Sequence, residues 1–189
     1  MNPSADIHSK LDKFAGSLDK PDTVRPEEGN TPSRSLYTLI EQQPFFRGLS
    51  GYHLQLLADS ALETRFDPGQ TIFAEGSPAN RFYLILTGKV VLGSEQEDHN
   101  ILPIQTLGPG DDLGWSWLFP PFSLHLSARA VEPTRTVFFY GPRLREQCEQ
   151  DHELGYQLMK RIAEVATQCL HATQLRLSEY IDRNRLAKG

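Results

Sequence analysis

Few side chains of this chain stand in arrangements that could carry out chemistry. Asp111 and Asp112 form a carboxylate pair, but the side chains of adjacent residues usually diverge, so the two acids are poorly placed to act together. The sequence contains no nucleophile beside a base, no cluster at metal-ligand spacing and no Gly-x4-Gly-Lys-Ser/Thr motif. The histidines are scattered over different predicted elements: His8, His53, His99, His125, His152 and His171. These patterns predict a protein without enzymatic activity, bound metal or cofactor.

The acidic pair lies in a segment, 107–130, that also holds a dense run of apolar residues. Within eight positions the run contains Trp115, Trp117, Leu118, Phe119, Pro120, Pro121 and Phe122. Such side chains can close a cavity, line a pocket for an aromatic or apolar effector, or form an exposed surface that binds a partner protein. The sequence leaves these three interpretations open.

The elements that position this segment are predicted to be short strands. Between Ala61 and Tyr140, runs of Val, Ile, Leu, Phe and Thr are separated by glycines, which is typical of an antiparallel sandwich or barrel. Gly76 and Gly88 are expected to adopt positive φ in tight turns. Residues 135–140 are predicted to pair with residues 124–130 as a hairpin. Alternation along the second segment places Leu124, Leu126, Ala128 and Ala130 on one face, and His125, Ser127 and Arg129 on the other.

Helical patterns flank the strands. Short helices are predicted near residues 36–40, ending before Pro44, and at 51–60. A final helix is predicted from about Asp151 to Arg183, because apolar residues recur there at steps of three and four: Leu154, Leu158, Ile162, Val165, Cys169, Thr173, Leu177 and Ile181. A helix of this length favours a two-stranded coiled coil and a homodimer with parallel C-terminal helices. A helix packed on its own sandwich is the alternative.

Composition restricts the partners. A net charge of −5 disfavours a general attraction to nucleic acid or to an anionic membrane. The two cysteines lack a histidine at ligand spacing, so free thiols in a reducing compartment are expected. No apolar run reaches the length of a membrane span and residues 1–10 are polar, so a cytoplasmic location is expected by elimination. Residues 1–32 are linker-like, except that Ile7, Leu11, Phe14 and Leu18 share one helical face, either as a transient helix or as a docking motif.

Four ordered motifs give the chain a family resemblance. Residues 44–50 (PFFRGLS), 66–77 (FDPGQTIFAEGS) and 81–90 (RFYLILTGKV) precede the loop at 107–130, with spacing that resembles the cyclic-nucleotide-binding-domain family of catabolite-activator and FNR-like regulators. The resemblance implies a mainly β fold with helices: an antiparallel double-stranded β-helix (jelly roll) of eight strands, followed by a long dimer helix. The implied domains are a disordered segment at 1–32, the jelly roll with short flanking helices at 33–148, and the dimerisation helix at 149–189.

The resemblance also implies an altered ligand site. In the family a loop reading Gly-Asp-x-Phe-Gly-Glu, a short helix and then Pro-Arg-x-Ala-x-Val-x-Ala cradle a cyclic phosphate, with the Glu on the ribose and the Arg on the phosphate. Here Trp115 replaces the Glu and Leu124 replaces the Arg. Losing two charged contacts of about 1.5–3 kcal/mol each weakens binding by roughly 10² to 10⁴-fold. Cyclic AMP and cyclic GMP are therefore expected to bind weakly or not at all, unless His125 or Arg129 takes over the phosphate.

Two sets of residues follow as candidates. The degenerate ligand loop comprises Gly110, Asp112, Leu113, Gly114, Trp115, Ser116, Leu124, His125, Ser127 and Ala128. The dimer helix comprises Leu158, Ile162, Val165, Cys169, Thr173 and Leu177.

The resulting prediction is a non-enzymatic regulatory module that binds a small apolar or aromatic effector, or a partner protein, and forms a homodimer. The alternatives are a DNA-linked transcription regulator of the catabolite-activator type and a surviving cyclic AMP sensor. Regulators of that type continue into a helix-turn-helix, whereas residues 182–189 offer three basic groups and no second helix. Direct DNA binding by this chain alone is therefore not expected.

Overall fold

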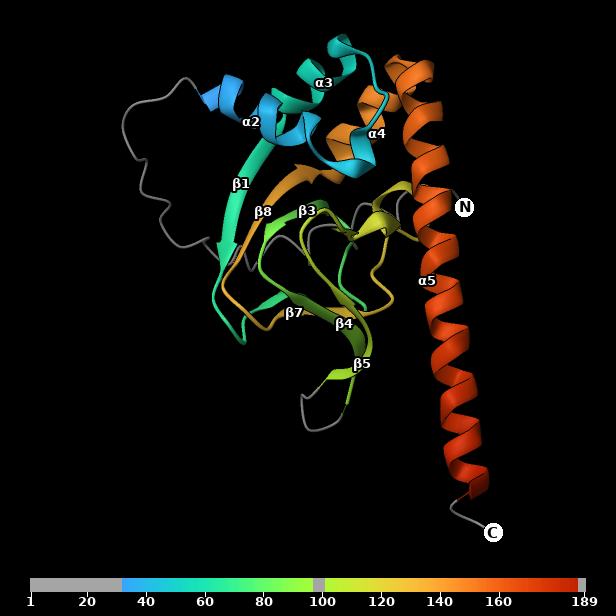
Figure 1. Ribbon diagram of the computed structural model, residues 1–189. Helices are drawn as coiled ribbons and strands as arrows, with labels where there is room; N and C mark the ends of the chain where they lie inside the picture. Colours follow the sequence, from blue (N-terminus) through green and yellow to red (C-terminus); the bar gives the residue numbers. More distant parts are fainter. Residues whose placement is uncertain (1–31, 97–100, 187–189) are drawn as a thin grey trace, which may run out of the picture. The chain divides into compact units, whose positions relative to one another are not determined.

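Two four-stranded antiparallel sheets form the body of the protein. The computed structural model describes residues 32–96 and 101–186, so the predicted apolar face at residues 7–18 lies outside the described part. The first sheet has the order β1 (Ala61–Phe66), β8 (Thr134–Tyr140), β3 (Arg81–Thr87), β6 (Asp112–Leu113). The second has the order β2 (Thr71–Phe73), β7 (Ser127–Ala130), β4 (Val90–Glu95), β5 (Ile101–Leu107). The predicted eight-stranded jelly roll is confirmed (Figure 1).

The predicted hairpin between residues 124–130 and 135–140 is wrong. β7 pairs with β2 and β4, whereas β8 pairs with β1 and β3, so the turn at 131–133 crosses from one sheet to the other. The turn signal was correct, but a turn signal does not specify which sheet receives the next strand. Gly88 makes this crossing possible: its φ is +93°, and a Cβ there would lie 2.5 Å from the carbonyl oxygen of Pro133.

Helices cover the outer face of the first sheet. They are α2 (Pro32–Glu41), η3 (Pro44–Phe46), α3 (Gly51–Ala58), α4 (Gly141–Gln150) and α5 (His152–Leu186); a further 3-10 helix, η4, spans Trp115–Leu118. Ser50 caps α3 by accepting a hydrogen bond from the His53 backbone N–H at 3.2 Å. The short helices predicted at 36–40 and 51–60 are confirmed.

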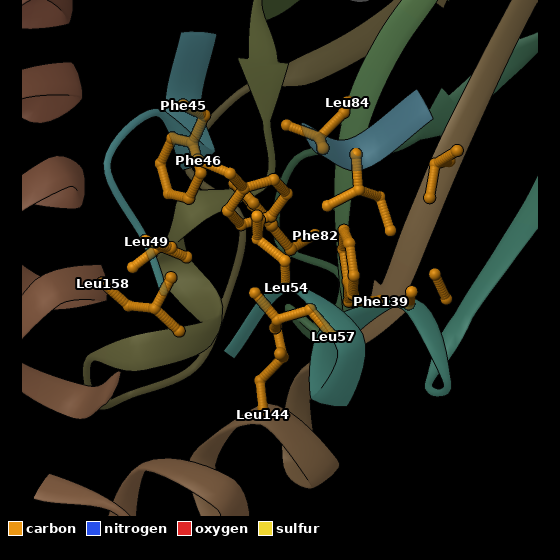
Figure 2. Packing of buried hydrophobic residues seen from close by; sticks show 14 of the residues in the cluster. Phe45, Phe46, Leu49, Leu54, Leu57, Phe82, Leu84, Phe139, Leu144 and Leu158 are labelled. Carbon is orange, nitrogen blue, oxygen red and sulfur yellow. The ribbon is translucent and has the colours of Figure 1, made fainter. Parts of the chain in front are cut away.

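The first hydrophobic core lies between these helices and the sheet. Phe82 and Leu84 of β3 face it, and Phe46 packs edge-on against Phe139 of β8 with ring centroids 5.5 Å apart. Leu158 of α5 joins the same cluster (Figure 2). The long helix is thus part of the core.

A second core fills the space between the two sheets. It consists of Ile72, Tyr83, Ile85, Val90, Leu92, Leu107, Leu113 and Ala128. Residues of β3 therefore alternate between the two cores, as expected for a strand buried on both faces.

α5 carries two apolar stripes rather than one. The inner stripe, formed by Leu154, Leu158, Ile162, Val165 and Cys169, faces the protein's own body, and its first three residues are at most 1% exposed. The outer stripe recurs at alternating steps of three and four residues and comprises Tyr156, Met159, Ala163, Ala166, Leu170, Thr173, Leu177 and Tyr180. Its large members are 51–66% exposed. Among the described helices, none is long and apolar enough to cross a membrane.

Candidate functional site

A pocket opens where the loop at 111–116 meets α5. Its enclosed cavity is about 70 Å³, and about 650 Å³ of space lies within it when the open mouth is counted. Its walls come from β2, β4, β5, the loop, residues 124–126 and α5: Phe73, Leu92, Gln105, Leu107, Asp111, Asp112, Leu113, Gly114, Trp115, Ser116, Leu124, His125, Leu126, Val165, Gln168 and Cys169. The enclosed part holds only a few water molecules or a small ligand group, so a larger organic molecule has to extend into the open mouth.

Backbone hydrogen bonds fix the loop to β3. Asp111 closes the turn by accepting the Gly108 N–H at 2.8 Å, and its own carbonyl accepts the Ile85 N–H at 2.9 Å. Gly114 ends β6 with φ +83°, in a position where a Cβ would lie 2.6 Å from the Arg81 carbonyl oxygen. The segment after β6 is therefore held close to β3, which places Trp115 at the start of η4 and in the pocket wall.

The two tryptophans of the aromatic run have different positions. Trp117 is 1% exposed in the first core, and Arg145 donates a hydrogen bond to its carbonyl oxygen. The same guanidinium lies 4.3 Å from the ring centroid of Phe122. Trp115 is partly buried and lines the pocket. Trp117 and Phe122 therefore help to build the structure, whereas Trp115 forms part of the pocket wall.

The two residues that replace the family's charged groups both line the pocket. Leu124 is 7% exposed and points inward, whereas His125 is exposed at the rim, as strand alternation predicted. Arg129 is not among the lining residues. Of the described residues that line the pocket, none is Lys or Arg, and two are acids, Asp111 and Asp112.

Asp112 is the most unusual group at the site. Its Oδ2 atom is buried without a hydrogen-bond partner among the described residues. Burial, with a smaller contribution from the charge of Asp111, raises the pKa of the Asp112 carboxyl to about 7. Asp112 lies opposite Leu84 in the β3–β6 register, so it faces the side of the sheet that the helices cover.

A polar groove adjoins the pocket. Its cavity is about 450 Å³, and it is lined by Pro44, Phe45, Arg47, Gly110, Asp111, Asp112, Gln157, Lys160, Arg161, Glu164, Val165 and Gln168. The two hollows share Asp111, Asp112, Val165 and Gln168. Arg161 donates to the carbonyl oxygens of Gln157 at 2.7 Å and of Arg47 at 2.8 Å, which ties α5 to the segment after η3.

The structure brings together most of the predicted loop residues. Those that line the pocket are Asp112, Leu113, Gly114, Trp115, Ser116, Leu124 and His125. Gly110 lies in the groove, and Ala128 is fully buried in the second core. Ser127 is also buried, where its hydroxyl accepts the Glu75 N–H at 2.8 Å and donates to Glu95 Oε2 at 3.2 Å. These last three residues do not line the pocket.

Several lining residues were missed as ligand-site candidates. Leu126 could have been included from the alternation that places Leu124 inward. Val165 and Cys169 were assigned to the dimer helix, yet they form a wall of the pocket. Gln105 of β5 and Gln168 of α5 carry no local signal in the sequence, because only the fold brings them to the pocket.

The six residues predicted for the dimer helix do not all lie on an exposed face of α5. Leu158 and Ile162 are 1% and 0% exposed in the protein's own core, so they are unavailable to a second helix. Thr173 and Leu177 belong to the outer stripe and are exposed. The predicted set therefore combined residues from both stripes of α5.

The chain is similar in sequence to a cyclic nucleotide-binding family model and to two cAMP-dependent regulators. Residues 63–151 match the family model described as cyclic nucleotide-binding domain. The chain is 30% identical over 127 residues to a CRP-like cAMP-activated global transcriptional regulator from Mycobacterium tuberculosis, covering 66% of this chain and 56% of the relative. It is 34% identical over 85 residues to a cAMP-dependent protein kinase regulatory subunit from Dictyostelium discoideum, covering 43% and 26%.

A solved structure from Geobacter metallireducens, described as a cyclic nucleotide-binding protein, is similar over its full length. It is 33% identical and superimposes with a TM-score of 0.64, covering 76% of this chain and 100% of that one. In contrast, the chain spans about half the length of the Mycobacterium tuberculosis regulator.

Proposed function

Because the chain belongs to the cyclic nucleotide-binding domain family, we propose that it is a regulatory module whose pocket binds a small non-nucleotide effector. One observation carries the proposal. The pocket is formed by the loop that resembles the family's ligand loop, yet the described lining holds two acids and no Lys or Arg. The named relatives are regulators rather than enzymes, which supports a regulatory role at the family level.

A cyclic phosphate entering this pocket meets unfavourable electrostatics. It loses hydration, finds the apolar side chain of Leu124 in place of a guanidinium, and meets no Lys or Arg among the described lining residues. The ribose hydroxyl meets the indole of Trp115, which has one donor and no acceptor comparable to a carboxylate. His125 lies at the rim and Arg129 is not in the lining, so neither is placed to compensate fully.

Calorimetry with cyclic AMP and cyclic GMP tests this proposal. At about 1 mM ligand we expect no saturable heat from either cyclic nucleotide. The double variant Trp115→Glu with Leu124→Arg should gain measurable cyclic AMP binding, whereas Trp115→Phe with Leu124→Met should not. Low-micromolar binding of cyclic AMP by the unmodified chain would contradict the proposal and indicate a cyclic AMP sensor.

α5 is suited to transmit occupancy of the pocket. Val165 and Cys169 form part of its wall, while Ala166 and Leu170, one position further along the helix, belong to the outer stripe. We expect the outer stripe to pair with the same stripe of a second copy, because its alternating three- and four-residue spacing is that of a two-stranded coiled coil. The alternative is that the outer stripe binds a partner protein instead of a second copy of this chain.

A DNA-linked transcription regulator is the second candidate. It is favoured by the Mycobacterium tuberculosis relative, whose name describes a transcriptional regulator and of which the chain covers 56%. A mobility-shift assay with genomic fragments at physiological salt separates the two candidates. We expect no specific retardation by this chain, and a defined retarded fragment would favour the regulator.

A further inference from the structure

The polar groove, rather than the pocket, has the volume of a typical small-molecule site. Its cavity of about 450 Å³ is within the range of roughly 300–1,000 Å³ that ligand clefts occupy, whereas the enclosed part of the pocket is about 70 Å³. The groove lies where the segment after η3 and the loop at 110–112 meet α5. We propose that the groove binds a small polar molecule that carries a phosphoryl group, held by Arg47, Lys160 and Arg161. This site is additional to the pocket of the proposed function, and neither site depends on the other.

Three cations gather at this groove because one of them ties the two segments together. Arg161 of α5 donates from Nη2 to the Arg47 carbonyl oxygen at 2.8 Å, which brings residue 47 beside the helix. Its Nη1 atom donates to the carbonyl oxygen and to the Oε1 atom of Gln157, at 2.7 and 2.8 Å, and these contacts orient the guanidinium. Lys160 precedes Arg161 on α5 and lines the same groove. The fold therefore fixes one cation and places two more at the same hollow.

Two of these cations lack an acidic partner among the described residues. Within 32–96 and 101–186, no ion pair joins the Arg47 guanidinium or the Lys160 ammonium to a carboxylate. Arg161 donates its three hydrogen bonds to neutral oxygens, and a guanidinium has further N–H groups that can donate to an oxyanion. Partial burial lowers the pKa of the Arg161 guanidinium, and the charge of Glu164 opposes this effect. An anion in the groove would supply the missing negative charge.

The acids of the groove oppose an anion only in part. Asp111 accepts the Gly108 N–H at 2.8 Å, which occupies its carboxyl in the loop turn. Burial, and to a lesser extent the charge of Asp111, raises the pKa of the Asp112 carboxyl to about 7, so this acid is mainly protonated at pH 6.5. Glu164 is the exposed acid of the groove, and its charge opposes an anion. At pH 6.5 the three cations therefore outnumber the charged acids.

The lining of the groove indicates the class of ligand. Arginine and lysine side chains bind phosphoryl oxygens through charge-assisted hydrogen bonds, and a phosphoryl dianion offers three oxygens to three cations. The apolar lining is limited to Pro44, Phe45 and Val165, whereas Gln157 and Gln168 provide amides, so a polar body such as a polyol is favoured. The net charge of −5 disfavours nucleic acid or an anionic membrane as the source of the phosphate. A small phosphate ester fits these conditions.

Matched probes test the charge preference. Glycerol 3-phosphate, glycerol and ethanolamine have small polar bodies and are anionic, neutral and cationic. In calorimetry on the full chain at pH 6.5 and low salt, we expect glycerol 3-phosphate to bind with a dissociation constant on the order of 0.1 mM, and the other two to give no saturable heat at about 10 mM. Salt at about 0.5 M should weaken the binding of glycerol 3-phosphate severalfold, because ions screen exposed charges.

Two variants one turn apart on α5 assign the binding to the groove. Lys160→Gln should weaken glycerol 3-phosphate binding about fivefold and Glu164→Gln should strengthen it by a similar factor, because one removes an attractive charge and the other a repulsive charge. Arg47→Gln should also weaken binding about fivefold. Arg143→Gln removes an exposed cation of α4 outside the groove and serves as the control. All four side chains are exposed, so the circular dichroism of each variant should match that of the unmodified protein.

The remaining outcomes contradict the proposal. If glycerol 3-phosphate does not bind, or if Arg143→Gln weakens its binding as much as Lys160→Gln does, the groove is not a phosphoryl site. If glycerol or ethanolamine binds as tightly as glycerol 3-phosphate, the ligand class is wrong. Trp115→Phe changes the pocket wall and should leave glycerol 3-phosphate binding unchanged, so a loss in this variant would place the probe in the pocket. None of these outcomes affects the cyclic nucleotide experiments that test the proposed function.

Discussion

The two stripes of α5 are both mainly apolar, but one is buried in the protein's own core and the other is exposed. The inner stripe begins with Leu154, Leu158 and Ile162, which lie in the protein's own core. The outer stripe holds Leu170 and Leu177, which are 56% and 58% exposed. Spacing therefore identifies an apolar face but does not say whether the same chain or another chain covers it. The inner stripe stabilises the fold, and the outer stripe is available for assembly.

The largest expected effect comes from breaking the inner stripe. Ile162→Ala removes buried methyl groups and leaves a cavity in the first core, so we expect a loss of about 2–5 kcal/mol in the free energy of unfolding. For a chain of this size the thermal midpoint should fall by roughly 4–20 °C in circular dichroism. Leu175→Ala, at a residue 68% exposed and off both stripes, is the control. A small shift for Ile162→Ala would show that α5 is not part of the core.

Breaking the outer stripe should change assembly rather than folding. We expect light scattering of the unmodified protein to give about twice the 21.3 kDa chain mass at micromolar concentration. Leu170→Glu with Leu177→Glu should give the single-chain mass and retain the circular dichroism of the fold. The Leu175→Glu variant is the control: it adds a charge between these positions but off the outer stripe, so this variant should still form a dimer. If the unmodified protein is monomeric, the outer stripe does not pair with the same stripe of a second copy.

A further prediction concerns the inner stripe of α5, because Asp112 and Val165 of that stripe line the same pocket. An acid whose pKa is raised to about 7 in the folded state costs stability once the unfolded chain ionises above about pH 4. The folded protein therefore loses stability as pH rises from about 4 to 7, by roughly a few kcal/mol. Asp112→Asn should raise the thermal midpoint at pH 8 and leave it almost unchanged at pH 4. An equal change at both pH values would contradict the burial of this carboxyl.

The smallest effect is expected at the beginning of α5. Asp151 accepts the Leu154 N–H at 3.0 Å and pairs with His53 Nε2 at 3.0 Å, and these contacts lower the pKa of its carboxyl. A lowered pKa adds stability above about pH 4 that is lost as pH falls through the folded-state value. Asp151→Asn should therefore lower the thermal midpoint slightly at pH 7 and leave it unchanged near pH 2, with Asp67→Asn as the comparison. An equal loss near pH 2 would exclude a contribution from the Asp151 charge.

Much of the fold could be predicted because its signals are local. The strand runs, the glycine turns and the ordered motifs predicted the jelly roll, and the final helix predicted at 151–183 is observed at His152–Leu186. Alternation also placed Leu124 inward and His125 outward correctly. Each of these inferences depends on residues that are neighbours in the sequence or on the same element.

The incorrect and missing inferences depend on contacts between distant segments. The sheet that β8 joins is set by pairing with β1 and β3, which the turn at 131–133 does not specify. The face of α5 that is buried depends on η3 and the first sheet. Asp112 looked like an ordinary loop acid beside Asp111, and only the fold shows that one of its oxygens is enclosed.

The position of the pocket along α5 gives the helix the properties of a lever. Its 35 residues make it roughly 50 Å long. The inner stripe holds its first half, and beyond the pocket wall Arg176 donates a hydrogen bond to the Ile104 carbonyl oxygen of β5 at 3.4 Å, so the segment from Arg176 to Leu186 extends for roughly 15 Å past that contact. A tilt of roughly ten degrees at that contact moves the far end by roughly 3 Å. A small ligand at the pocket wall would therefore move a part of α5 that it does not touch.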